Sequence, residues 1–150
     1  MHGLPVFLSL LQSCWFAPAT PIKEALSRCE RALPRKSKNP TGDMSLKRVE
    51  TPNAHCNDGS PPAMFLRAAT NPEHRQDWVV FLEGGGSCAS NPGCQERWCG
   101  QGYFNATKMS SDFYDEREDG GGMMSSSPMN PFHDWNIVEM KYCSSDIWLG

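Results

Sequence analysis

The sequence contains no apolar run long enough to cross a bilayer and no excess of positive charge. Its longest mostly apolar stretch, residues 3–17, is short and interrupted, whereas a membrane-spanning helix needs about 20 consecutive apolar residues. The 150 residues carry 14 Lys and Arg against 17 Asp and Glu, which gives a net charge of -3. No basic stripe with interleaved aromatic residues occurs. We therefore predict neither a stable membrane span nor a nucleic-acid partner.

The motif Gly-x-Ser-x-Gly, which presents a nucleophilic serine on a sharp turn between a strand and a helix, is also missing. Residues of the types found in a catalytic triad are present, namely Ser144, Ser145, His133, His74 and Asp146. Serines as frequent as these are usually plain surface hydroxyl groups. We do not expect these residues to make a complete triad.

Two ligand sites suggested by the glycines and cysteines do not fit their usual patterns. A phosphate-binding loop needs widely spaced glycines followed by Lys and Ser or Thr, and Gly84–Gly86 has neither. Cys88, Cys94, Cys99 and His133 are zinc-ligand types, but five residues separate Cys88 from Cys94, more than the two to four of structural zinc sites. We predict no metal and no cofactor.

Seven cysteines favour an oxidising compartment for a chain of this length. Residues 1–19 have the pattern of a secretory signal peptide, because the apolar stretch ends at the small residues Ala17-Pro18-Ala19. The region before it lacks Lys and Arg, so a partly buried N-terminal segment or an incorrectly assigned start are the alternatives. Asn105 begins an Asn-Ala-Thr sequon and is a glycosylation site if the chain is secreted.

The next part of the chain, residues 20–53, is polar, basic and interrupted by prolines. This composition predicts a disordered linker or pro-segment, so the folded part is expected to span residues 54–150. Residues 63–68 and 78–82 are predicted strands that form an antiparallel hairpin at a sheet edge, and residues 135–142 are a further strand. The fold class is α/β, with an incomplete sheet and few helices to cover it.

Residues 78–86 are central to this prediction. Val79, Val80, Phe81 and Leu82 follow one another without polar alternation, which is typical of a strand buried on both faces. Three glycines follow at its carboxyl end, where open α/β sheets place their ligands. A flexible loop is the simpler interpretation of three glycines, but glycine-rich loops after an early strand also donate oxyanion-hole amides in α/β-hydrolases. We favour the oxyanion-hole interpretation.

Four motifs, in this order along the chain, resemble those of the pectin acetylesterase/Notum family. They are Cys-Asn-Asp-Gly-Ser-Pro-Pro-Ala at 56–63, Phe-Leu-Glu-Gly-Gly-Gly-Ser-Cys at 81–88, Trp-Asn at 135–136 and Tyr-Cys-Ser-Ser-Asp-Ile-Trp at 142–148. Together they cover residues 54–150, and four in order are far more specific than any one. Ser87 departs from the aromatic residue often found after these glycines, which leaves the acyl preference open.

The resemblance implies an α/β-hydrolase fold and a secreted serine carboxylesterase, extracellular or in the cell wall. Its substrates would be O-acetyl or O-acyl esters on a polysaccharide or a protein. It carries Gly85 and Gly86 over as oxyanion-hole amides, and it implies the disulfides Cys56–Cys143 and Cys88–Cys94. Cys29 and Cys99 are then left over, and they either pair with each other or leave Cys99 for a partner elsewhere.

The family's nucleophilic serine, Asp and His all lie C-terminal to the matched motifs, and none of them is in this sequence. We therefore expect a fragment of an esterase that supplies the oxyanion-hole loop and hydrolyses nothing alone. The alternative is a secreted, disulfide-stapled binding module without a catalytic half.

Overall fold

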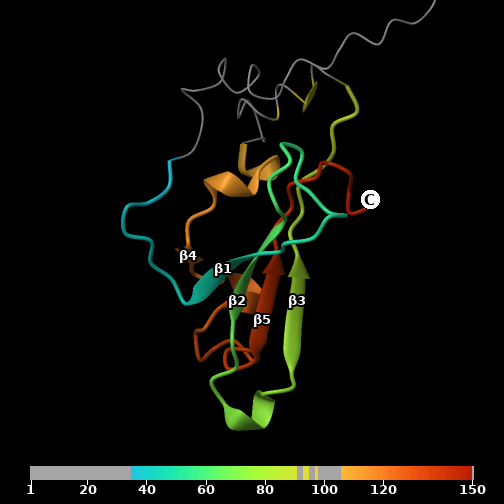
Figure 1. Ribbon diagram of the computed structural model, residues 1–150. Helices are drawn as coiled ribbons and strands as arrows, with labels where there is room; N and C mark the ends of the chain where they lie inside the picture. Colours follow the sequence, from blue (N-terminus) through green and yellow to red (C-terminus); the bar gives the residue numbers. More distant parts are fainter. Residues whose placement is uncertain (1–34, 91–92, 95–96, 98–105, 150) are drawn as a thin grey trace, which may run out of the picture.

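The computed structural model describes residues 35–90, 93–94, 97 and 106–149 (Figure 1). Within these residues, five strands form one sheet in the order β3-β5-β2-β1-β4. Their bounds are Met44–Arg48 for β1, Ala63–Arg67 for β2, Trp78–Leu82 for β3, Arg117–Glu118 for β4 and Asn136–Met140 for β5. The connections hold the short 3-10 helices η1 (Pro72–His74), η2 (Ala106–Lys108), η3 (Ser111–Phe113) and η4 (Gly122–Met124). A small, open sheet with few helices is the incomplete α/β fold that the sequence predicts.

The pairing of the strands corrects the expected hairpin. β3 runs parallel to β5, with Trp78 opposite Asn136 and Leu82 opposite Met140, while β5 also pairs antiparallel with β2. β5 therefore lies between β2 and β3, which do not pair with each other.

The side chain of Asn136, at the start of β5, explains this arrangement. Its amide nitrogen donates to the carbonyls of Arg75 and Asp77 at 3.0 and 2.9 Å, and its oxygen accepts from the Ala69 amide at 2.9 Å. These bonds join β5 to the connection between β2 and β3. Asn136 lies 59 to 67 positions after these three partners in the sequence, so no local pattern in residues 63–82 reveals that β5 is inserted between β2 and β3.

The expected linker at 20–53 is corrected as well, because the sheet includes residues 44–48 of it. β1 pairs with β2 and with β4, and its Met44 and Leu46 are buried in the core. The alternating pattern Met-Ser-Leu-Lys-Arg is short and lies among prolines and charges, so it is weak evidence for a strand in the sequence. Residues 1–34, which include the predicted signal peptide, lie outside the described residues.

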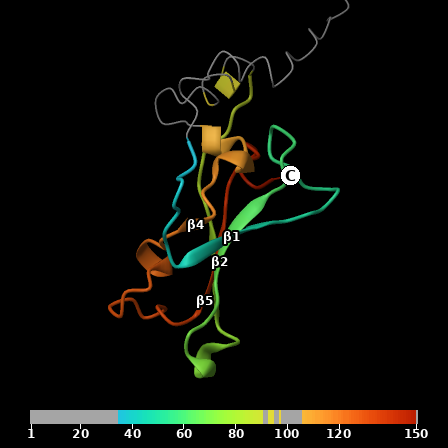
Figure 2. The same cartoon turned by 60° about the vertical axis from the view of Figure 1, so that its left-hand side comes forward.

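One face of the sheet carries the hydrophobic core. Met44, Leu46, Ala63, Phe65 and Ile137 of the strands pack there against Tyr114 and Met124. Figure 2 shows the segment around η4 to one side of the strands. None of the helices in the described part of the chain is long and apolar enough to cross a membrane.

β3 is not buried on both faces as the sequence predicts. It is the last strand on its side of the described sheet, and Trp78, Val80 and Leu82 on its outer face are 52%, 61% and 54% exposed. Val79 and Phe81 pack against the core. The apolar composition of β3 suits a strand that is packed against protein on both faces, but the described residues pack against only one of its faces.

A group of charged side chains lies at the end of the core. The ammonium of Lys141 is 3.1 Å from carboxylate oxygens of Glu83 and Glu139 and 3.6 Å from Glu118. It also lies 5.6 Å from the ring centroids of Phe65 and Tyr114. Burial raises the pKa of Glu118 to about 7, because Lys141 offsets only part of the desolvation and Glu139 repels a second negative charge.

The raised pKa of Glu118 predicts a pH-dependent effect of replacing it. The native state holds this proton more tightly than the unfolded chain, so the ionised carboxylate destabilises the fold as pH rises from about 4.5 to about 7. Glu118→Gln should therefore raise the melting temperature relative to the unsubstituted chain at pH 8, and the gain should disappear near pH 4.5. The exposed Glu50→Gln is the control. An equal gain at both pH values would contradict the prediction.

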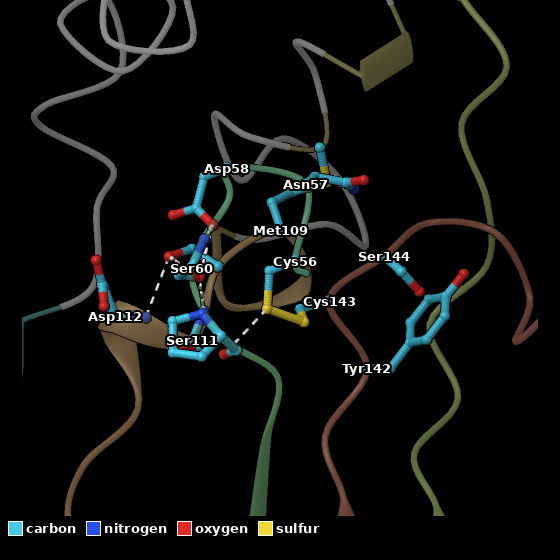
Figure 3. The surroundings of a disulfide bond; sticks show 12 residues. Cys56, Asn57, Asp58, Ser60, Met109, Ser111, Asp112, Tyr142, Cys143 and Ser144 are labelled. Carbon is cyan, nitrogen blue, oxygen red and sulfur yellow. Dashed lines mark hydrogen bonds between the residues drawn. A yellow bond between two sulfur atoms is a disulfide. The ribbon is translucent and has the colours of Figure 1, made fainter. Parts of the chain in front are cut away.

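Both disulfides implied by the family resemblance are bonded in the structure. Cys56–Cys143 joins the loop before β2 to the residues after β5 across a sequence separation of 87, and Cys88–Cys94 closes a short loop. Figure 3 shows Cys56 and Cys143 beside a group of polar side chains. In that group the Ser60 hydroxyl donates to Asp58 at 2.6 Å and accepts from the Ser111 amide at 3.0 Å.

The two disulfides should stabilise the fold unequally. In the chain-entropy model, replacing both cysteines by alanine costs roughly 4–5 kcal/mol of unfolding free energy for Cys56–Cys143 and roughly 2 kcal/mol for Cys88–Cys94. Urea denaturation of the two double variants measures the difference. Equal losses would show that loop length does not govern their contributions.

Candidate active site

The glycine turn, residues 83–86, follows β3 and begins with a firmly held glutamate. The Glu83 carboxylate is 2.5 Å from the ammonium of Lys108 and 3.1 Å from that of Lys141, and it accepts from the Tyr142 amide at 2.9 Å. Burial alone would raise the pKa of Glu83, but these hydrogen bonds and positive charges outweigh it and lower the pKa below its ordinary value. Glu83 is therefore an ionised group that holds the turn against the end of β5.

All four carbonyl oxygens of the glycine turn accept a hydrogen bond from a side chain. The donors, in the order of the carbonyls of residues 83 to 86, are Trp148 Nε1 at 3.1 Å, Lys108 Nζ at 3.2 Å, Arg97 at 2.5 Å and the Tyr142 hydroxyl at 2.7 Å. Each donor comes from a different position of the chain. The turn is therefore held in one conformation from its carbonyl side.

The amides of the turn are in the opposite situation. Within the part of the chain that the structure describes, Gly84, Gly85 and Gly86 donate no backbone hydrogen bond. Unpaired amides in a fixed turn are the usual donors to the oxyanion of a tetrahedral intermediate. The geometry is thus compatible with the oxyanion-hole role expected for Gly85 and Gly86.

The three glycines differ in whether the structure requires a glycine at their position. Gly86 has φ +67°, in the left-handed region that favours glycine. A Cβ at Gly85 would collide with the ring carbons Cδ1 and Cε1 of Tyr142, whereas one at Gly84 would meet nothing within 4 Å. Gly85 and Gly86 are therefore fixed by the structure and Gly84 is not.

The loop of residues 144–148 lies beside the glycine turn at the same end of the sheet (Figure 1). Three of its non-glycine residues have φ near +60°, namely Ser145, Ile147 and Trp148. For a β-branched residue such as Ile147 this conformation is unfavourable, and such residues cluster at functional sites. The Asp146 carboxylate holds the loop, because it accepts from the Ser144 hydroxyl at 2.5 Å and the Trp148 amide at 3.0 Å.

The residues of the alternative catalytic triad are not brought together. Ser144 donates to Asp146, and Ser145 accepts a bond from Asn57 at 2.6 Å, both beyond the end of β5. His133 precedes the start of β5 and His74 lies in η1, 2.6 Å from Asp77. His133 and His74 therefore lie at the opposite end of the strands from Ser144 and Ser145.

The remaining predicted site residues fall into two groups. Cys88 and Cys94 are bonded to each other and so are not thiolate ligands of a metal. Asn105, Cys29 and Cys99 lie outside the described residues.

A cavity of about 410 Å³ borders the 144–148 loop, and its lining includes Val49, His55, Pro62, Met140, Ser144 and Trp148.

Lys108 and Arg97 are site residues that sequence reasoning does not identify. Both stand outside the recognised motifs, and a single basic residue in a loop carries no local signal of its partner. Tyr142 and Trp148 do belong to a recognised motif, but their hydrogen bonds to the turn follow only from the pairing of β3 with β5.

The three glycines should respond differently to alanine. Gly84→Ala should leave the free energy of unfolding within about 0.5 kcal/mol of its original value. Gly86→Ala should lower it by roughly 1–2 kcal/mol through left-handed backbone strain, and Gly85→Ala by roughly 1–3 kcal/mol through the clash with Tyr142. Chemical denaturation of the three variants tests this order. A Gly84 variant as unstable as the other two would contradict the description of the turn.

Comparisons with known proteins identify the family. The family model described as Pectinacetylesterase matches residues 36–150. A palmitoleoyl-protein carboxylesterase NOTUM from Schmidtea mediterranea is 40% identical over 100 residues, and palmitoleoyl-protein carboxylesterase notum1a from Danio rerio is 36% identical over 110 residues. These matches cover 65% and 72% of this chain but only 18% and 21% of the relatives, so the chain spans about a fifth of their length.

A shorter relative has nearly the same extent as this chain. It is named inactive palmitoleoyl-protein carboxylesterase notum1b, from Danio rerio, and it is 31% identical over 126 residues. The match covers 83% of this chain and 86% of the relative. By the family match and by these relatives, the chain belongs to the pectinacetylesterase family, which includes Notum-type carboxylesterases.

Proposed function

We propose that this chain supplies the oxyanion-stabilising turn of a secreted carboxylesterase domain and hydrolyses no ester alone. The observation that carries the proposal is the glycine turn, whose carbonyls are all bound and whose amides donate to no described residue. In ester hydrolysis, attack on the acyl carbon places negative charge on the carbonyl oxygen. Amides of Gly85 and Gly86 would stabilise that charge, each contributing roughly 3 kcal/mol to lowering the barrier.

The nucleophile and its base would come from a further part of such a domain. The sequence contains no Gly-x-Ser-x-Gly, and the hydroxyl groups of Ser144 and Ser145 bond to Asp146 and Asn57 rather than to a histidine. The exposed apolar residues Trp78, Val80 and Leu82 on an outer strand support the same proposal, because they suit contact with further protein. Residues 54–150, together with β1, would then be the N-terminal part of the domain.

The substrate class follows from the relatives and from the family. Several relatives are named palmitoleoyl-protein carboxylesterases, and the family model is that of pectinacetylesterases. We therefore propose O-acyl or O-acetyl esters on protein or polysaccharide as substrates of the complete domain. Two disulfides are consistent with secretion, after removal of a signal peptide at 1–19, to the extracellular space or cell wall.

The short relative named inactive favours a second candidate, a secreted binding module that holds an ester without cleaving it. The two disulfides and the fixed turn suit such a module equally well. An ester-hydrolysis assay on this chain joined to a catalytic part separates the two candidates. The esterase candidate predicts hydrolysis that depends on the glycine turn, and the binding-module candidate predicts none.

The first test uses the full chain with p-nitrophenyl acetate and p-nitrophenyl octanoate. The release of nitrophenol should not exceed that of buffer, and Ser144→Ala and Ser145→Ala should change nothing. Turnover that either serine substitution abolishes would contradict the proposal that the chain alone is inactive.

The second test joins the chain to a catalytic part. In this chimera, the matched residues of this chain replace the corresponding 100 residues of the Schmidtea mediterranea relative. The chimera should hydrolyse p-nitrophenyl octanoate. Gly85→Ala and Gly86→Ala should then lower kcat by on the order of 100-fold, while Gly84→Ala should retain most of it. A folded chimera whose rate is insensitive to Gly85 and Gly86 would exclude an oxyanion role for this turn.

A further inference from the structure

The two amides proposed to meet the oxyanion belong to peptide groups whose carbonyls are bound by cations. A trans peptide group is planar, so the N–H of one residue points opposite to the C=O of the residue before it. The Gly85 amide therefore shares a plane with the Gly84 carbonyl, to which Lys108 donates at 3.2 Å. The Gly86 amide shares a plane with the Gly85 carbonyl, to which Arg97 donates at 2.5 Å.

The two neighbouring peptide groups have neutral donors instead. The indole of Trp148 donates to the Glu83 carbonyl at 3.1 Å, and this carbonyl belongs to the same peptide group as the Gly84 amide. The Tyr142 hydroxyl donates to the Gly86 carbonyl at 2.7 Å, and this carbonyl belongs to the same peptide group as the Ser87 amide. Positive charge is thus confined to the middle two of four consecutive peptide groups.

Both cations are held in place by contacts of their own. The ammonium of Lys108 is 2.5 Å from a carboxylate oxygen of Glu83, and both side chains are less than one-fifth exposed. The guanidinium of Arg97 lies 5.6 Å from the centroid of the Tyr142 ring, and Arg97 is fully buried. Tyr142 in turn packs against Gly85, and its hydroxyl accepts from the Ile147 amide at 2.7 Å.

A cation on a carbonyl oxygen does two things for the amide of the same peptide group. A charge-assisted hydrogen bond fixes the peptide plane more strongly than a neutral one does. It also draws electrons toward the oxygen, which makes the N–H a stronger donor, and the effect is larger in partly buried surroundings.

We infer that Lys108 and Arg97 are positioning residues that orient and polarise the Gly85 and Gly86 amides for an oxyanion. The inference rests on the proposed function of the glycine turn, but it makes a separate statement about the chain itself. Each of four side chains governs one particular amide: Trp148 that of Gly84, Lys108 that of Gly85, Arg97 that of Gly86 and Tyr142 that of Ser87.

The test on the full chain is a set of amide spectra by ¹H–¹⁵N correlation NMR. Lys108→Met should shift the Gly85 amide resonance most and Arg97→Met the Gly86 resonance most. Trp148→Phe and Tyr142→Phe should act mainly on Gly84 and Ser87. Lys108→Arg should restore the Gly85 resonance, and Lys47→Met, which removes an exposed lysine charge, is the control. Uniform shifts over all four amides would overturn the assignment.

A measurement on the unsubstituted chain keeps the inference testable where a variant fails to fold. Amide exchange near neutral pH is catalysed by base, and a nearby cation stabilises the amide anion that forms. The Gly85 and Gly86 amides should therefore exchange faster than the Gly84 amide. Slower exchange at Gly85 and Gly86 would overturn the inference.

The chimera described above supplies the kinetic readout. Lys108→Met and Arg97→Met should lower kcat roughly ten- to hundredfold with little change in KM, because the oxyanion exists only beyond the ground state. Unchanged kcat in both variants would overturn the inference. An inactive unsubstituted chimera would count against the proposed function, while the NMR result on the chain would still decide the roles of Lys108 and Arg97.

Discussion

The parallel pairing of β3 with β5 is the constraint on which the rest of this structure depends. Parallel strands end at the same edge of a sheet, so the chain segments that follow them emerge side by side. The segment after β3 is the glycine turn, and the segment after β5 carries Tyr142 and Trp148. Every contact between the turn and the 144–148 loop follows from this one pairing, and the disulfide Cys56–Cys143 joins the second segment to the loop before β2.

Ion pairs at the end of the hydrophobic core also hold the glycine turn. Glu83 begins the turn, and its carboxylate forms ion pairs with Lys108 and Lys141. Lys141 also forms ion pairs with Glu118 of β4 and Glu139 of β5, so this group of charged side chains links the core to the turn. Because the residues are partly buried, these attractions are stronger than those of exposed pairs. The group explains why Glu83, between an apolar strand and three glycines, is a charged residue.

Backbone strain and exposed apolar side chains on the outer strand are the two features that bear on the proposed contact with further protein. Ile147 and Trp148 have φ near +60°, which is an unfavourable backbone conformation for these residues. Their amides donate to the Tyr142 hydroxyl and the Asp146 carboxylate, and these bonds hold the conformation. Trp78, Val80 and Leu82 on β3 are more than half exposed. Both features suit contact with further protein, and the matches to this chain cover only 18% and 21% of two of its relatives.

The sequence alone determines the local elements: the apolar run of β3, its end at three glycines, the strands at β2 and β5, and the motifs that identify the family. These depend on composition and short spacings, which a single segment contains. The place of β5 between β2 and β3, the exposure of Val80, and the inclusion of β1 in the sheet were decided by tertiary structure, because each depends on residues far apart along the chain. The same holds for Lys108 and Arg97, since a basic residue has no pattern that names its carbonyl partner.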